Sequence, residues 1–369
     1  MFSSRTPAQL APNRLATALA ERRARGDRVI DLTASNPTRA GFTYPPDLLA
    51  PLADPEALRY DPQPLGAIDA RVAVAQEYQK QGLTVSPERI VLAASTSDAY
   101  SVLFKLLADP GDEVLVPRPS YPLFEHLTRL DAIGIRPYDL EYHGAWSVDL
   151  ASVERALGPR SRALLVVSPN NPTGSVIARD ELARLSAICA ANDMAVIADE
   201  VFIDYELEPG ACAAAGRVIA RDDVLSFTLG GLSKSVGLPQ VKLGWIAVGG
   251  PAPLVSAAIA RLELICDTYL AVSTPVQHAA RRMLTAGAMV RDQIAERVRH
   301  NYESLRASVS AVPSCRVLRA DAGVLVHPGY FFDFPRECFV VVSLLPPPAD
   351  FADGVDRILR HFACSPATP

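Results

Sequence analysis

Short apolar runs alternate with amphipathic segments through the middle of the chain. Six of the runs have the length and composition of buried strands: RIVLAA (89–94), DEVLVP (112–117), RALLVV (162–167), MAVIAD (194–199), DVLSFT (223–228) and GWIAV (244–248). Strands that alternate with helices are typical of α/β proteins. The pattern therefore predicts a mainly parallel sheet flanked by helices.

Helical periodicity fills the intervals between these runs. In SDAYSVLFKLLAD (97–109) one face carries four large side chains, Tyr100, Leu103, Phe104 and Leu107. RDELARLSAICAAND (179–193) is a second helix of this kind, and a long one is expected over 275–310. Before residue 60 the chain is rich in proline, which predicts irregular structure.

This order of elements predicts a large domain over 50–265 and a smaller α+β domain built from both chain ends, 1–49 and 266–369. Strands near 323–327 and 339–345 would supply the sheet of the smaller domain. Only about ten residues separate the end of the long helix from the next apolar run. The smaller domain is therefore expected to be shortened near 312–322.

The composition narrows the class of protein. A chain of 369 residues with 49% hydrophobic residues can bury a large core, and its net charge of −5 argues against nucleic-acid binding. No apolar run reaches the roughly 18 residues of a membrane span, and the N-terminal sequence lacks a signal-peptide core. We expect a cytoplasmic protein with neither a membrane nor a nucleic-acid partner.

Cysteine and histidine give no sign of a metal site. The cysteines are widely spaced, without a C-x-x-C pair or a neighbouring histidine: Cys189, Cys212, Cys266, Cys315, Cys338 and Cys364. H-E-x-x-H is absent as well. The sequence predicts buried free thiols and no metal.

Polar residues follow the predicted strands where a ligand crevice is expected in a parallel sheet. Ser95, Thr96 and Ser97 open the helix after the first run, so their hydroxyls and the helix N–H groups can form a phosphate cup. Serine and threonine are also ordinary helix caps. The loop RPSYP contributes a flat aromatic ring, Tyr121.

Lys234 is one of only four lysines, beside Lys80, Lys105 and Lys242. It lies between glycine-bearing turns in GLSKSVG, where a desolvated amine would have a lowered pKa and could form a Schiff base. The alternative is a solvated surface lysine.

Two further strand ends carry polar groups. Asp199 ends an apolar strand, and a buried carboxylate there needs a cation, either a protonated pyridine nitrogen or an arginine. SPNNPTG (168–174) is more rigid than a connector requires, and Pro172 would aim Asn171 through a trans or a cis peptide bond. Otherwise this segment is a simple turn. Together with Lys234, the phosphate cup and Tyr121, these residues supply the parts that hold pyridoxal phosphate.

Three segments in order resemble motifs of the class I/II aminotransferase family, the fold-type I pyridoxal-phosphate enzymes. SPNNPTG is similar to N-P-T-G, ADEVFIDY (198–205) to D-E-x-[YF], and GLSKSVGLPQVKLGW (231–245) to S-K-x-x-G-x-x-G-x-R-x-G-[YW]. The resemblance covers almost the whole chain. It implies the fold-type I architecture and an aminotransferase that moves an amino group between an amino acid and a 2-oxo acid.

The resemblance also implies roles for individual residues. Lys234 would carry the cofactor aldimine, Asp199 would pair with the pyridine nitrogen, Asn171 would donate to the phenolic oxygen, and Tyr121 would stack on the ring. Ser95, Thr96, Ser97, Ser233 and Lys242 would hold the phosphate. Tyr60 would reach the neighbouring subunit's site, which implies a homodimer with composite active sites. The segment DTYLAVSTPVQ (267–277) resembles one that family members lend across that interface.

Four positions depart from the family pattern: Phe202 for tyrosine, Gly231 for serine, Lys242 for arginine, and Val341 for the arginine that clamps the substrate carboxylate. Asn36 and Asn171 would then act as neutral donors to that carboxylate, with Arg39 or Arg336 as its cation and Arg39 preferred. Two other functions stay open, a pyridoxal-phosphate lyase or decarboxylase, and a non-catalytic binding or regulatory protein. The sequence does not identify the amino donor, the acceptor or the biosynthetic process.

Overall fold

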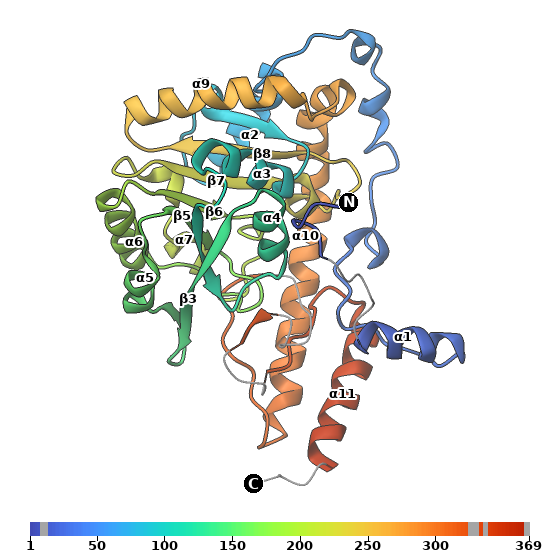
Figure 1. The fold of residues 1–369 in the computed structure, drawn as a ribbon. Helices are drawn as coiled ribbons and strands as arrows, with labels where there is room; N and C mark the ends of the chain where they lie inside the picture. The colour runs from blue at the N-terminus through green and yellow to red at the C-terminus, as the bar shows by residue number, and fades with distance from the viewer. Residues whose placement is uncertain (8–13, 324–331, 335–338, 365–369) are drawn as a thin grey trace.

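The computed structural model describes residues 1–7, 14–323, 332–334 and 339–364. One mixed sheet dominates it (Figure 1). Its strands, in spatial order, are β1 Ile90–Ala93, β8 Gly244–Gly249, β7 Ser226–Gly231, β6 Ala195–Asp199, β5 Ser161–Val167, β2 Glu113–Arg118, β3 Gly134–Tyr142 and β4 Trp146–Val148. β8 runs antiparallel to both of its neighbours, and β4 is antiparallel to β3. The other pairs are parallel.

Alternating side chains bury both faces of this sheet. One face packs against α3 Thr96–Leu107, α4 Leu123–Leu130 and α9 Ala252–Tyr269, and includes Ile197, Phe227 and Ile246. The other face packs against α5 Leu150–Ala156 and α6 Arg179–Ala191 at one end, and against α2 Ile68–Lys80 and α10 Thr274–Ser310 at the other. The two-sided burial explains why the strands read as continuous apolar runs.

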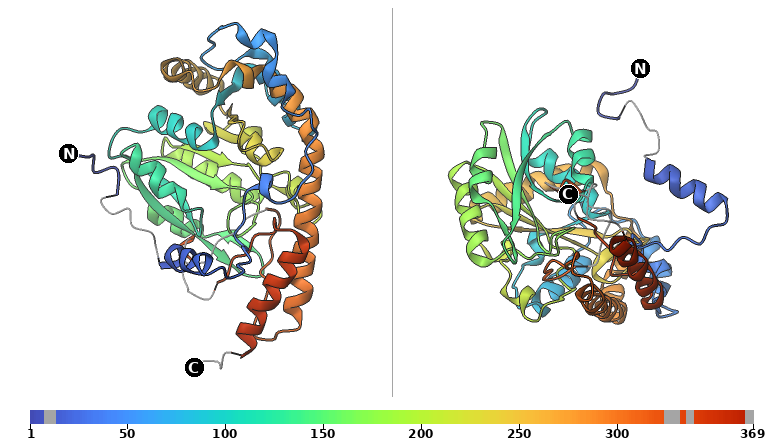
Figure 2. Two further views of the ribbon diagram at one scale, coloured as in Figure 1. Left: turned by 90° about the vertical axis from the view of Figure 1, so that its right-hand side faces the viewer. Right: turned by 90° about the horizontal axis from the view of Figure 1, so that it is seen from below.

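The chain ends form a mainly helical region. α10 runs along one side of the molecule, and α11 Pro348–Cys364 lies beside its C-terminal half (Figure 2). Between them, Val290, Ile294 and Val298 of α10 pack with Leu345 and Phe351. α1 Arg14–Ala24 has no buried residue and stands apart from the rest of the fold (Figure 2). The remaining helical turns are short: η1 Pro37–Arg39, η2 Ala50–Ala53, η3 Pro55–Leu58, η4 Pro87–Arg89, α7 Ala211–Ala214, η5 Val218–Ala220 and α8 Leu232–Ser235.

The six predicted strands and the three predicted helices are present, with one displaced strand. The strand expected at 223–228 starts at Ser226 and continues through Gly230 and Gly231, where the sequence predicts a turn. These glycines pair with Trp245 and Gly244 of β8. A Cβ on Gly230 would lie 2.5 Å from the Trp245 indole, so the strand needs glycine there because the neighbouring ring occupies the space of a side chain.

Two expectations for the chain ends are wrong. Residues 339–345 do not form a strand, because their bonds go to isolated groups of the N-terminal segment: Ser343 N–H donates to Leu32 O at 2.7 Å and its hydroxyl to Ala34 O at 2.6 Å. The proline-rich start includes α1 and three short turns, so it is not wholly irregular. The strand expected at 323–327 lies outside the described residues except for Gly323.

Candidate functional site

Adjacent strand ends bring Asp199 and Lys234 together. Asp199 is the last residue of β6 and pairs with Leu229 of β7, which leads into α8 and Lys234. Burial lowers the pKa of the Lys234 amine below its usual 10.5, and the nearby Asp199 carboxylate partly opposes that shift. A larger share of the amine is therefore unprotonated near neutral pH, which makes it a nucleophile.

The Asp199 carboxylate has two hydrogen-bond donors. Its Oδ2 accepts from the Tyr100 hydroxyl at 3.1 Å, and its Oδ1 from Val201 N–H at 3.2 Å. Burial raises the pKa of Asp199 to about 6, against the lowering effect of both bonds and of Lys234. The alternative partner for this strand end, an arginine, is not among these contacts, so the carboxylate remains able to meet a cation from a ligand.

Aromatic side chains enclose Lys234. Its Nζ lies 5.5 Å from the centre of the Phe202 ring, which is buried. The Tyr205 hydroxyl donates to the Lys234 backbone carbonyl. The Tyr205 bond helps to fix the short α8 helix, and Lys234 is half-buried, so it is not a fully solvated surface lysine.

The two asparagines in the loop after β5 have different contacts. Asn170 shapes the loop: its Oδ1 accepts from the Thr173 hydroxyl at 3.0 Å, and its backbone bonds to Gly174 and Ser175. Asn171 is buried, and its Oδ1 has no hydrogen-bond partner within the described part of the chain. The cis bond of this loop precedes Pro169 and not Pro172. A buried amide with unused capacity is costly unless a ligand completes it.

The start of α3 brings together the three residues predicted to form a phosphate cup, with Ser95 used as the helix cap. Ser95 caps the helix, since its Oγ accepts from Asp98 N–H at 3.1 Å. Thr96 and Ser97 form the first turn, whose N–H groups have no acceptor within the helix. Gly244 lies against this turn: a Cβ on it would be 2.8 Å from the Ser95 backbone. The absence of a side chain at Gly244 keeps the cup close to the sheet.

The remaining predicted cofactor residues lie at the periphery of this group. Tyr121 is within electrostatic reach of Asp199, because burial and that carboxylate together raise the pKa of its phenol. Ser233 directly precedes Lys234 and is half-buried. Lys242 is exposed, with a left-handed backbone at φ 61°, and Tyr60 is 73% exposed. The structure of the single chain therefore does not bring Tyr60 to Lys234.

Two of the predicted substrate residues, Asn36 and Arg39, lie in a local turn on the surface. Asn36 is exposed and caps η1, accepting from Thr38 N–H at 3.0 Å and from its hydroxyl at 2.7 Å. Arg39 follows in the same turn and is exposed. Arg336 lies outside the described residues, while Val341 is half-buried in the irregular 339–345 segment. The side-chain oxygen of Asn36 is thus already bonded within this turn.

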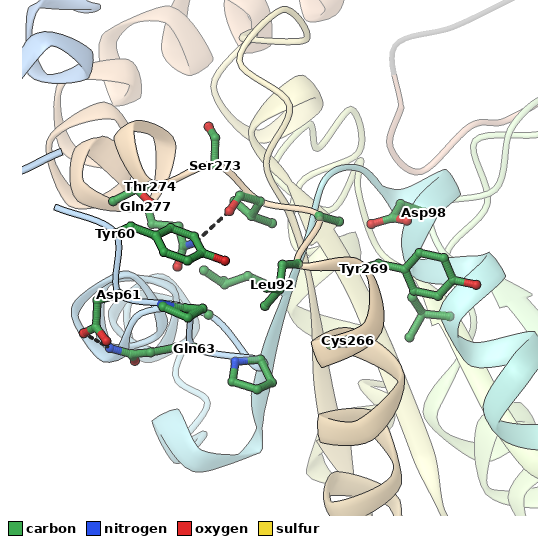
Figure 3. A pocket seen from close by; sticks show the side chains of 17 residues that line it. Tyr60, Asp61, Gln63, Leu92, Asp98, Cys266, Tyr269, Ser273, Thr274 and Gln277 are labelled. Atoms are coloured by element: carbon green, nitrogen blue, oxygen red, sulfur yellow. Dashed lines mark hydrogen bonds between the residues drawn. The ribbon is translucent and has the colours of Figure 1, made fainter. Parts of the chain in front are cut away.

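A cavity of about 170 Å³ lies beside the α3 helix, apart from Lys234. Its walls come from the loop at Tyr60 and from the segment after α9, with Tyr269 and Gln277 (Figure 3). Gln277 bridges the two walls, because its Nε2 donates to Val272 O at 2.8 Å and its Oε1 accepts from Ala67 N–H. Both walls belong to segments that sequence analysis assigned to a subunit interface.

Two sequence-based expectations were incomplete. Tyr100 was assigned only to the packed face of its helix, because nothing in the sequence connects it with Asp199, 99 positions away. The sequence predicts Gly174 as a turn residue, but its carbonyl also accepts from Asp321 and Ala322 N–H at 2.8 and 2.9 Å.

No helix in the described part of the chain is long and apolar enough to cross a membrane.

The arrangement matches a known family. The family model for aminotransferase class I and II matches residues 28–330. The chain belongs to this family. Its members depend on pyridoxal phosphate, which agrees with the grouping of Lys234, Asp199 and Asn171 at neighbouring strand ends.

Among curated relatives, glutamate-pyruvate aminotransferase AlaA of Escherichia coli is 30% identical over 266 residues, 70% of this chain. An alanine aminotransferase of Mycobacterium tuberculosis is 30% identical over 275 residues, 73% of this chain. The matched region spans 64% and 63% of those proteins, a little under two thirds of their length.

Solved structures confirm the fold. An Escherichia coli aminotransferase aligns over 99% of this chain and 98% of its own, with a TM-score of 0.84 and 23% identity. Alanine aminotransferase from Pyrococcus furiosus aligns over 93% of this chain and 94% of its own, with a TM-score of 0.81 and 22% identity. The predicted fold-type I α/β architecture is therefore correct.

Proposed function

We propose that the chain is a pyridoxal-phosphate-dependent aminotransferase that uses Lys234 as its cofactor lysine. One observation carries this proposal: the half-buried Asp199 ends β6, the half-buried Lys234 follows the adjacent strand β7 in α8, and the Asp199 carboxylate acts on the pKa of the Lys234 amine. A phosphorylated pyridine aldehyde needs such a pair, with the amine for its aldehyde carbon and the carboxylate for its ring nitrogen.

Three further features support the fit of this cofactor. Asn171 is buried in the loop after β5, and it is the NH2 of its amide that would donate to a ligand, while its Oδ1 has no partner among the described residues. The first turn of α3 offers amides and hydroxyls from Ser95, Thr96 and Ser97 to a phosphate. Tyr121 lies near Asp199, where its ring can cover a planar ligand. Bound there, pyridoxal phosphate supplies the electron sink for removal of the substrate's α-proton.

Each residue then has a defined task. Lys234 would hold the cofactor through its aldehyde carbon and would take and return the proton at the substrate Cα. Asp199 would hold the pyridine nitrogen, and the side-chain NH2 of Asn171 would donate to the phenolic oxygen. Ser233, next to Lys234, and Lys242, at the far end of the lysine segment, would complete the phosphate site. The Phe202 ring would lie beside the reacting amine, with its centre 5.5 Å from Nζ.

We also propose a cytoplasmic homodimer with composite sites. Tyr60 and Tyr269 line the cavity of Figure 3 and are 73% and 60% exposed, and Leu58 beside them is 91% exposed. Exposed aromatic and aliphatic side chains gathered in this way are typical of a protein interface. In such a dimer Tyr60 would reach the partner's phosphate site, which explains why it lies far from Lys234 within one chain.

The substrates we propose are an amino acid and a 2-oxo acid used in a biosynthetic process. Arg39, with Asn36 and Asn171 as neutral donors, would hold the carboxylate that the family arginine, replaced by Val341, usually binds. Two relatives are named for alanine or for glutamate and pyruvate, so these are the first pairs to try. Arg39→Ala should raise the KM for the amino acid about tenfold, equal to about 1.4 kcal/mol, and leave cofactor affinity unchanged.

A half-reaction tests the proposed activity. Purified protein loaded with pyridoxal phosphate receives glutamate or alanine alone, and the cofactor is then extracted and identified. An aminotransferase converts it to pyridoxamine phosphate and releases one equivalent of 2-oxo acid. A lyase or decarboxylase would release product and leave the cofactor as pyridoxal phosphate. A non-catalytic protein would change neither.

A further inference from the structure

We infer that Tyr100 is a positioning residue for the cofactor, acting through its hydrogen bond to Asp199. The inference rests on the proposed function, since it assigns a role toward the pyridine nitrogen. Tyr100 lies on α3, and its hydroxyl is 3.1 Å from Asp199 Oδ2. The family resemblance gave this position no task.

The Tyr100 ring is fixed before any ligand arrives. The side chain is buried, and it packs edge-on against Phe124 with ring centres 5.3 Å apart and at 6.0 Å from Phe104. Because the ring cannot turn away, the hydroxyl stays aimed at the carboxylate. Burial raises the pKa of the Tyr100 phenol well above 10, and Asp199 adds to this, so the hydroxyl keeps its proton and is the donor.

Four ionisable groups act on Asp199 from the elements around it. Lys234 on α8 and the Tyr100 hydroxyl on α3 favour the charged carboxylate, while Glu200 beside it disfavours it. Tyr121, from the loop after β2, is neutral near pH 7, since burial raises its phenol pKa. If Lys234 is bonded to the cofactor, its ammonium charge no longer stabilises the Asp199 carboxylate as it does in the cofactor-free protein. Tyr100 then remains as the side-chain donor that holds the carboxylate.

The physical consequence concerns protonation. Asp199 must be a carboxylate to accept from the pyridine N–H, yet burial works against that form. A hydroxyl donor stabilises the carboxylate and fixes Oδ2 in one place, which leaves the other lone pairs available to the ring nitrogen. Removal of the hydroxyl should raise the pKa of Asp199 further and weaken cofactor binding wherever the carboxyl becomes neutral.

The first test uses cofactor-free protein and the variant Tyr100→Phe, which keeps the ring. Its matched control is Tyr138→Phe, since Tyr138 is equally buried but donates to the backbone carbonyl of Leu165 at 2.7 Å. Melting temperatures are measured from about pH 5, where Asp199 is mostly neutral, to about pH 8, where it is ionised. The loss in Y100F should grow with pH, because only the carboxylate depends on the donor; the loss in Y138F should stay constant.

The second test measures the Kd for pyridoxal phosphate by equilibrium dialysis over the same pH range. Y100F should bind about tenfold more weakly near pH 6, the effect of one lost bond to a charged group, and almost normally near pH 8.5. Y138F should show the same ratio to the parent at every pH. A pH-independent weakening in Y100F would mean that Tyr100 is only a packing residue.

A double-mutant cycle tests whether the effect of Tyr100 depends on Asp199. If Tyr100 acts through Asp199, Y100F should change cofactor affinity less than twofold in an Asp199→Asn background. An equal loss in both backgrounds would overturn the inference. If the parent protein binds no pyridoxal phosphate, the proposed function fails instead, whereas the cofactor-free melting curves still report on the Tyr100–Asp199 bond.

Discussion

The amine of Lys234 lies 5.5 Å from the centre of the Phe202 ring, at the position where the family motif often has tyrosine. Phenylalanine offers no hydroxyl, so the ring presents only its apolar surface to the amine. Burial is the main reason that the pKa of Lys234 falls. We expect Phe202 to contribute to that burial.

Phe202→Ala should raise the pKa of Lys234 toward its usual value, because water reaches the amine when the ring is removed. The pH at which Lys234 reaches half its maximal labelling rate, followed by peptide mass spectrometry on cofactor-free protein, should move upward. Phe351→Ala is the control, since Phe351 belongs to the same apolar cluster and is equally inaccessible. An unchanged labelling profile in F202A would show that other groups desolvate the amine.

Sequence patterns located most of the site because its residues follow apolar strands. Asp199 ends such a run, and Lys234 and the Ser95–Ser97 turn follow others within a few residues, so the sheet brings these groups together. Strand β7 was displaced in the prediction because Gly230 and Gly231 look like a turn, and only the Trp245 ring on the neighbouring strand explains them.

Other contacts depend on packing that no local pattern encodes. The Tyr100–Asp199 bond joins a helix to a strand 99 positions later, and the Tyr205 hydroxyl reaches the Lys234 carbonyl across 29 positions. The strand expected at 339–345 fails for a related reason. Its apolar run is real, but no neighbouring strand among the described residues pairs with it.

Asp199→Asn should abolish most turnover, because a neutral amide cannot keep the pyridine nitrogen protonated. The same variant should stabilise the cofactor-free protein near pH 8. The folded pKa of about 6 exceeds the ordinary 3.8, so the carboxyl contributes stability below pH 3.8 that is lost as the pH rises through about 6. The cost avoided in the variant is on the order of 2–3 kcal/mol.

Urea unfolding of both cofactor-free proteins at pH 4 and pH 8 checks this prediction. The variant should gain over the parent only at the higher pH. Near-normal turnover in the variant would show that Asp199 is not the pyridine partner. Equal stability of the two proteins at pH 8 would show that Asp199 is not a costly buried acid.

The ion pair between Glu200 and Arg217 should be essential for the fold behind the site. Their side chains are 4% and 13% exposed, with Arg217 Nη2 2.6 Å from Glu200 Oε2. Arg217→Ala leaves the buried Glu200 unpaired and should cost about 3 kcal/mol of unfolding free energy. Glu200→Gln with Arg217→Met should cost less, because no charge is left alone. Arg357→Ala, which breaks an exposed pair with Asp353, serves as the control and should change little.

The composite dimer predicts complementation between two defective variants. Lys234→Ala and Tyr60→Ala are each refolded alone and then together. A mixed dimer regains one intact site from the lysine of one subunit and the Tyr60 of the other, so the random mixture should recover about a quarter of parent activity. Recovery no greater than the sum of the separate variants would contradict shared sites.

Sedimentation of the parent should show a dimer, and Leu58→Asp should shift it toward monomer. Leu130→Asp, at an exposed leucine on α4, should shift it less.

Covalent trapping of the cofactor tests the account most directly. The protein is loaded with pyridoxal phosphate, reduced with borohydride, digested and mapped by mass spectrometry, with Lys234→Arg as the control. The pyridoxyl group should be on Lys234, because this amine is desolvated beside Asp199 and Phe202. The label on Lys80, Lys105 or Lys242 in place of Lys234 would contradict the assignment of the site.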